Sequence, residues 1–143
     1  MSFLVNEIRN AAIAAGVDAQ SFVYGRSFDS AIETGIKDTL DAFAFLDPVI
    51  KKGTISDRKE SYRVSIGFIK QDAPDSSELE RETMVDEMDD LCLDFLQILF
   101  DLNIAADGTI LMFDSYSISP IYRIKNVCTG VLCTFEVMAN RPC

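Results

Sequence analysis

Residues 76–102 constrain the fold of this chain most, because they predict one long amphipathic helix. Apolar residues recur there at steps of three and four, which gathers them into one stripe on a helix of 3.6 residues per turn. Ser76 and Ser77 are candidate N-caps, and Glu80 lies three residues after Ser77, as in a capping box. A helix with one apolar stripe needs a surface to cover, so we expect it to pack on a sheet. The stripe comprises Val85, Met88, Leu91, Cys92, Phe95, Leu96, Leu99 and Leu102.

The opposite face of this predicted helix is strongly acidic. Residues 75–102 contain ten carboxylates and a single cation, Arg81, and so carry nine of the ten net negative charges of the chain. Carboxylates adjacent on a helix can bind a divalent metal or act as an acid/base pair. However, calcium ligands usually come from loops, and carboxylate sites on helices normally include histidine, which this chain lacks. We therefore expect a solvated face, whose most crowded members are Asp86, Glu87, Asp89 and Asp90.

The chain before this helix predicts a first helix and three β segments. Ser2–Ala15 has apolar residues on one face and ends at Gly16, a typical left-handed helix terminator. Residues 41–50 are rich in aromatic and β-branched types, but Pro48 lacks an amide donor, so this strand should bend at a sheet edge. Residues 62–68 alternate between apolar and polar types, as in a strand with one covered face, and should form a hairpin with the preceding strand. A brief strand is expected at 21–24, a long loop at 26–39 and a polar turn at 51–59.

The chain after the helix predicts three more β segments. They lie at 109–113, at 115–124 with a bend at Pro120, and at 127–138. Neither face of the last segment is fully polar, so we expect another subunit to cover part of the sheet. Residues 1–143 are thus predicted to form a single α+β domain, with an antiparallel or mixed sheet packed by an N-terminal helix and one long central helix.

Composition excludes several classes of function. The chain has no histidine, and its four cysteines show no C-x-x-C spacing, so the usual zinc sites and a His-assisted nucleophile are not available. It has no phosphate-binding glycine motif, and a pI near 4.3 opposes binding to a nucleic-acid backbone. It also has no apolar run long enough to span a membrane and no apolar core of a signal peptide at its start. We expect no enzyme activity, metal, cofactor or membrane partner, and synthesis in the cytoplasm.

A basic segment precedes the acidic helix. Residues 51–70 have a net charge of plus four, against minus nine for residues 75–102. One interpretation is a solvated hairpin beside a solvated helix. The other is head-to-tail pairing in a ring, in which the basic hairpin of one subunit meets the acidic helix of the next. The residues predicted for such an interface between subunits are Lys51, Lys52, Arg58, Lys59, Asp86, Asp89 and Asp90.

The sequence resembles the tail terminator, or minor tail, proteins of long-tailed bacteriophages. The segments that carry the resemblance are FVYGRSF at 22–28, FAFLDPV at 43–49, YRVSIGFIKQD at 62–72, ERETMVDEMDDLCLDFLQIL at 80–99 and TGVLCTFEV at 129–137. The resemblance implies a structural protein that assembles in the host cytoplasm into a ring, usually a hexamer, in the neck of the virion. Its partners would be further copies of itself, the tail tube protein and the head-completion or connector protein. DNA would pass through the lumen without specific binding.

Two alternatives remain open from the sequence. One is a different connector of the neck, such as an adaptor or head-completion protein, for which the number of subunits in the ring would differ. The other is a small non-viral binding module, or an enzyme with an unusual carboxylate site, for which a monomer or dimer with a ligand-sized pocket would be expected.

Overall fold

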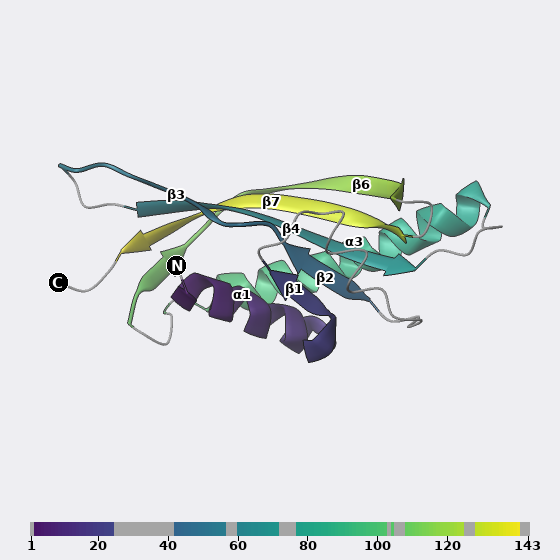
Figure 1. Ribbon diagram of the computed structural model, residues 1–143, viewed down its shortest axis with the longest axis horizontal. Coiled ribbons are helices and arrows are strands. Elements are labelled where there is room, and N and C mark those ends of the chain that lie inside the picture. Colours follow the sequence, from purple (N-terminus) through teal and green to yellow (C-terminus); the bar gives the residue numbers. More distant parts are fainter. Residues whose placement is uncertain are drawn as a thin grey trace.

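The computed structural model describes residues 2–24, 42–56, 60–71, 77–102, 104, 108–124 and 128–140 (Figure 1). The loop predicted at 26–39 lies outside these residues. The two described α-helices and the seven strands confirm an α+β fold. The elements, which include one short 3-10 helix, are α1 (Ser2–Ala15), η1 (Ala19–Ser21), β1 (Phe22–Tyr24), β2 (Phe43–Leu46), β3 (Ile50–Gly53), β4 (Glu60–Gln71), α3 (Glu78–Asp101), β5 (Ile110–Met112), β6 (Tyr116–Ile124) and β7 (Cys128–Asn140).

The two longest strands, β4 and β7, form the centre of the sheet. They pair antiparallel without interruption from Glu60 opposite Ala139 to Gln71 opposite Cys128. The outer edge of each central strand pairs with two short strands in succession: β2 and β3 pair with β4, and β6 and β5 pair with β7. These pairs are all antiparallel, whereas β1 lies parallel to β2 and makes the sheet mixed.

The bend predicted at Pro48 separates β2 from β3. Proline has no amide hydrogen and cannot donate to the ladder. Just before Pro48, the amide of Asp47 donates a backbone hydrogen bond to the carbonyl of Ser65, at 3.0 Å. Beyond the bend, Lys51 and Lys52 belong to β3 and pair with β4. The sequence prediction of a turn at these two residues is therefore wrong, because pairing with β4 continues through polar residues that show no apolar alternation.

The second predicted bend is at Pro120, which lies inside β6 opposite Val131. The irregularity in the ladder comes just after it, between Ile121 and Ile124. Because β6 is an edge strand, Pro120 is tolerated without ending the strand.

Both helices pack against the same face of the sheet and share one core with it (Figure 1). The prediction of α3 is confirmed at its start, where the Ser77 hydroxyl accepts a hydrogen bond from the amide of Glu80 at 3.2 Å. The same hydroxyl donates to the carboxylate of Glu80 at 3.3 Å. Phe95 packs between Phe68 of β4 and Phe135 of β7, with ring centroids 5.2 and 6.2 Å away. The predicted core residues Val85, Met88, Cys92, Phe95 and Leu99 are all buried.

The face of the sheet opposite the helices contains a second, smaller apolar cluster. Phe45 lies opposite Gly67 in the β2–β4 ladder, and both residues are buried. A Cβ atom added at Gly67 would lie 2.1 Å from the Phe45 ring. Glycine is therefore required here because the ring occupies the space of a side chain. The buried members of this cluster are Phe43, Phe45, Ile69 and Cys128.

The substitution Gly67→Ala tests this packing. The added methyl group must displace the Phe45 ring, so we expect the free energy of unfolding to fall by about 1–3 kcal/mol, as for other overpacked cores. Urea unfolding followed by circular dichroism measures the change. In a Phe45→Leu background the same substitution should cost much less, since the smaller side chain leaves room. An equal loss in both backgrounds would contradict the proposed contact.

Candidate interaction surfaces

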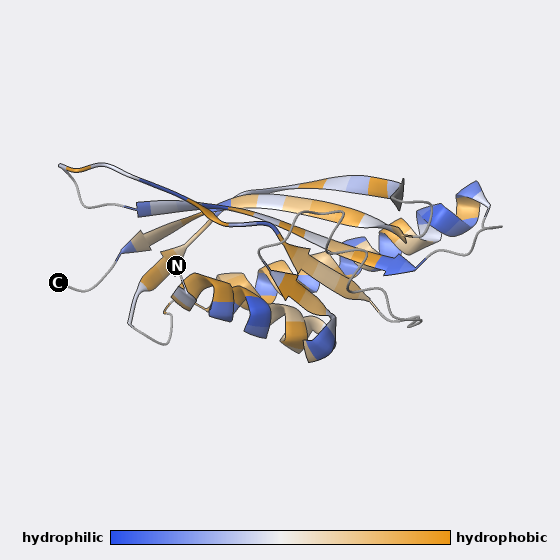
Figure 2. Ribbon diagram, viewed as in Figure 1, coloured by the Kyte–Doolittle hydropathy of each residue, from blue (hydrophilic) through white to orange (hydrophobic). Residues whose placement is uncertain are grey.

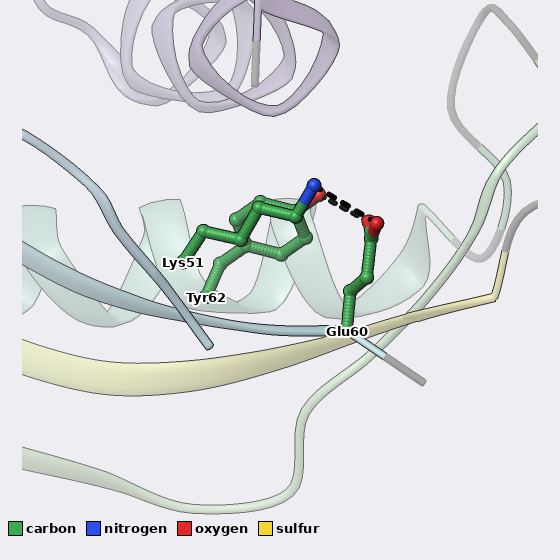
Figure 3. A network of polar contacts seen from close by, with 3 residues as sticks. All are labelled: Lys51, Glu60 and Tyr62. Carbon is green, nitrogen blue, oxygen red and sulfur yellow. Dashed lines mark hydrogen bonds and ion pairs between the residues drawn. The ribbon is translucent and has the colours of Figure 1, made fainter. Parts of the chain in front are cut away.

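The first surface is the basic hairpin, which we define as β3, the turn residues 54–56 and the start of β4. Lys51 lies on the helix side of the sheet, where its ammonium group contacts the carboxylate of Glu60 at 2.9 Å. The hydroxyl of Tyr62 donates a hydrogen bond to the same carboxylate at 2.6 Å, and Figure 3 shows the three side chains converging. The Tyr62 ring is buried and meets the ring of Phe3 from α1 edge-on at 5.8 Å. Lys51 is therefore anchored within its own chain and supports the hairpin.

Lys52 has a different environment from Lys51. Side chains alternate between the two faces of a strand, so Lys52 lies on the face away from the helices. It is exposed, as is Arg63 on the same face of β4. Two apolar side chains accompany these cations: Ile50, which is 53% exposed, and Ile55 in the turn, which is fully exposed. The two isoleucines were missed in the sequence prediction, although an isoleucine inside a polar turn is itself a signal of an exposed anchor. The other two predicted cations, Arg58 and Lys59, lie outside the described residues.

The predicted carboxylates of α3 remain on its outer face. Asp86 and Asp90 are exposed and Asp89 is partly buried. Glu87 contacts the ammonium group of Lys70 at 3.4 Å, which links α3 to the end of β4. Among the residues that the structure describes, no group of three or more Cys, His, Asp or Glu side chains could hold a metal ion.

The second surface, which we call the acidic groove, lies where the first turns of α3 approach β6. The hydroxyl of Tyr122 donates a hydrogen bond to the carboxylate of Glu82 at 2.5 Å, and this bond is the main reason that the pKa of the tyrosine is raised. Leu79 is 78% exposed and Tyr122 is 50% exposed, so the groove combines carboxylates with an apolar surface. Its volume is about 610 Å³, and its lining residues are Glu78, Leu79, Arg81, Glu82 and Tyr122.

A third surface, which we call the aromatic groove, lies between the C-terminal half of α3 and the junction of β5 and β6. Phe100 is half exposed and meets the ring of Phe113 edge-on at 5.8 Å. The volume of this groove is about 320 Å³, at the lower end of the range of about 300–1,000 Å³ typical of ligand pockets. Its lining residues are Leu93, Leu96, Gln97, Phe100, Phe113, Asp114 and Tyr116.

Two thiols meet in the core between α3 and β7. The pKa of Cys92 is raised well above its ordinary value, first by a hydrogen bond with Cys133 and then by burial. Because the thiolate is the reactive form of cysteine, these buried thiols are poor nucleophiles. Their environment is that of small apolar core residues.

The basic hairpin and the acidic groove lie at opposite ends of the long axis of the molecule (Figure 1). Figure 2 shows hydrophilic residues along β3 at one end and on the first turns of α3 at the other. The basic hairpin and the first turns of the acidic helix are thus separated in space by the length of β4, whereas Lys70 at the end of β4 contacts Glu87 of α3. This separation leaves both surfaces available to other molecules.

The sequence matches no model of a known protein family, and no curated protein is significantly similar to it. In the part of the chain that the structure describes, no helix is both long and apolar enough to cross a membrane.

The exposed carboxylates of α3 should cost stability in the isolated subunit. Asp86, Asp90 and Asp94 follow one another at four-residue steps, and each like-charged pair destabilises a helix by about 0.2–0.5 kcal/mol. We expect the triple substitution to asparagine to raise the free energy of unfolding by up to about 1 kcal/mol at low salt. Urea unfolding of dilute protein at low and high salt measures this effect.

The matched control for this prediction is Glu78→Gln in the first turn of the same helix. There the helix dipole favours a negative charge, so the expected change has the opposite sign, a loss of about 0.3–1 kcal/mol. Both effects should shrink as salt is added. A loss of stability in the triple variant would show that these carboxylates have stabilising partners within the chain.

Proposed function

We propose that this protein is a tail terminator of a long-tailed bacteriophage, which assembles as a ring at the end of the tail tube and joins the tail to the head-completion or connector proteins. The role is structural and needs no catalytic group, metal or cofactor. The resemblance of five sequence segments supports this class of protein and, within it, a hexamer located in the neck of the virion.

The observation that carries the proposal is that the basic hairpin and the acidic groove lie at opposite ends of the molecule. A surface at one end that complements a surface at the other produces a heterologous, head-to-tail contact. Repetition of such a contact closes into a ring when the rotation between neighbours allows it, or continues as a filament when it does not. The exposed Ile55 and Leu79 at the two ends supply apolar area of the kind that interfaces bury.

The net charge supports passage of DNA without binding. The chain carries a formal charge of minus ten, whereas affinity for the phosphate backbone comes mainly from clustered Lys and Arg side chains. A ring of such subunits would repel the phosphates of DNA in its lumen. The same reasoning applies to an adaptor or head-completion protein of the neck, which is the second candidate and which the number of subunits would distinguish.

Light scattering after size exclusion, at about 50 mM and about 1 M salt, tests the proposal. The Debye length falls from more than 10 Å to about 3 Å between these conditions, which screens contacts between exposed charges. We expect a ring-sized species at low salt and smaller species at high salt. A monomer of 15.9 kDa, or a closed dimer, at both salt concentrations would exclude a ring that assembles by itself through charge pairing.

A further inference from the structure

We infer that the acidic groove of one subunit is the docking site for the basic hairpin of the next copy of this chain. This inference rests on the proposed ring but goes beyond it, because it names the two surfaces that meet. It also changes the interface predicted from the sequence. The contact is placed on Glu78 and Glu82 in the first turns of α3, and not on Asp86, Asp89 and Asp90 further along the helix.

Charge selects these two surfaces. Among the residues that the structure describes, those lining the groove carry two carboxylates, Glu78 and Glu82, against one guanidinium group, that of the partly buried Arg81. The hairpin presents Lys52 on the face away from the helices, whereas Lys51 lies on the helix side, where its ammonium group already contacts Glu60. Lys52 is therefore the cation that we place against the rim of the groove. Complementary charges of this kind guide association and fix the register of the two partners.

The basic hairpin and the acidic groove also match in their exposed apolar side chains. Ile55 projects fully exposed from the turn of the hairpin, and Leu79 and Tyr122 form an exposed apolar surface in the groove. The hydrogen bond to Glu82 holds the Tyr122 ring in place, so this surface is already formed before any partner binds. We place Ile55 against Leu79 and the Tyr122 ring, with Lys52 toward Glu78 and Glu82. The aromatic groove has Asp114 as the one carboxylate among its described lining residues, so it complements the basic hairpin less well.

Exchange of charges between the two surfaces tests the inference. The hairpin variant is Lys52→Glu, and the groove variant combines Glu78→Lys with Glu82→Lys. Each variant alone brings like charges together, so we expect the contact to weaken more than about tenfold and the ring to dissociate at low salt. An equal mixture of the two variants restores opposite charges at every contact, because the two kinds of subunit alternate. The mixture should therefore form rings again, with an even number of subunits.

Two controls test whether the variants are folded and whether the effect depends on where along α3 the charge is reversed. Circular dichroism should match that of the unmodified chain, because all three substituted side chains are exposed. Urea unfolding of the groove variant should remain cooperative but show a modest loss of stability, because positive charge at the start of α3 opposes the helix dipole and Glu82 no longer accepts the hydrogen bond from Tyr122. Asp101→Lys, a charge reversal at the other end of α3, should leave the ring intact. Rings of unchanged stability in both test variants, or a mixture that remains monomeric, would overturn the inference while leaving the proposed function in place. Absence of rings in the unmodified chain would instead count against the proposed function.

A photo-crosslink gives an independent readout. A benzophenone amino acid in place of Ile55 should form crosslinks between subunits, which mass spectrometry would locate at 78–82 or at Tyr122. Crosslinks between the subunits of a ring that fall on any other segment would overturn the inference, because Ile55 would then contact another surface.

Discussion

The antiparallel pairing of β4 with β7 is the constraint on which the rest of the structure depends. Twelve consecutive residue pairs fix which side chains of the two strands face the helices and which face away. Tyr62, Phe68 and Phe135 point into the core, where Phe95 of α3 packs between the last two. The same ladder sets the length of the molecule, because β4 begins in the basic hairpin and ends beside the start of α3. The separation of the two charged surfaces is thus a direct consequence of one long strand.

The sequence predicted those elements whose signals are local. Ser77 and Glu80 mark the start of α3, its apolar stripe identifies the buried face, and Pro48 marks the break between β2 and β3. The prediction failed where contacts with a distant part of the chain determine the local structure. Lys51 and Lys52 look like turn residues, yet they form a strand because β4 offers a free edge. The acidic groove was missed for the same reason, since Tyr122 and Glu82 are forty residues apart in the chain.

The two ends of the molecule differ in how their charges are used. At the hairpin, Lys51 is held by Glu60 within the chain, which leaves Lys52 and the two exposed isoleucines on the outside. At the other end, Glu78 and Glu82 lie beside the exposed side chains of Leu79 and Tyr122. An isolated subunit therefore has apolar and charged groups at both ends that a neighbour can cover. In the proposed ring, pairing of these ends places Lys52 against Glu78 and Glu82 and buries Ile55 against Leu79.

Single-particle imaging of the protein at low salt tests the central claim most directly, because it reports the symmetry of the assembly. We predict closed rings of six copies with cyclic symmetry, and a contact that joins the hairpin of each copy to the start of α3 in the next. Particles with two-fold symmetry, in which the same surface of both copies forms the interface, would contradict the proposed ring, since a head-to-tail contact cannot produce them.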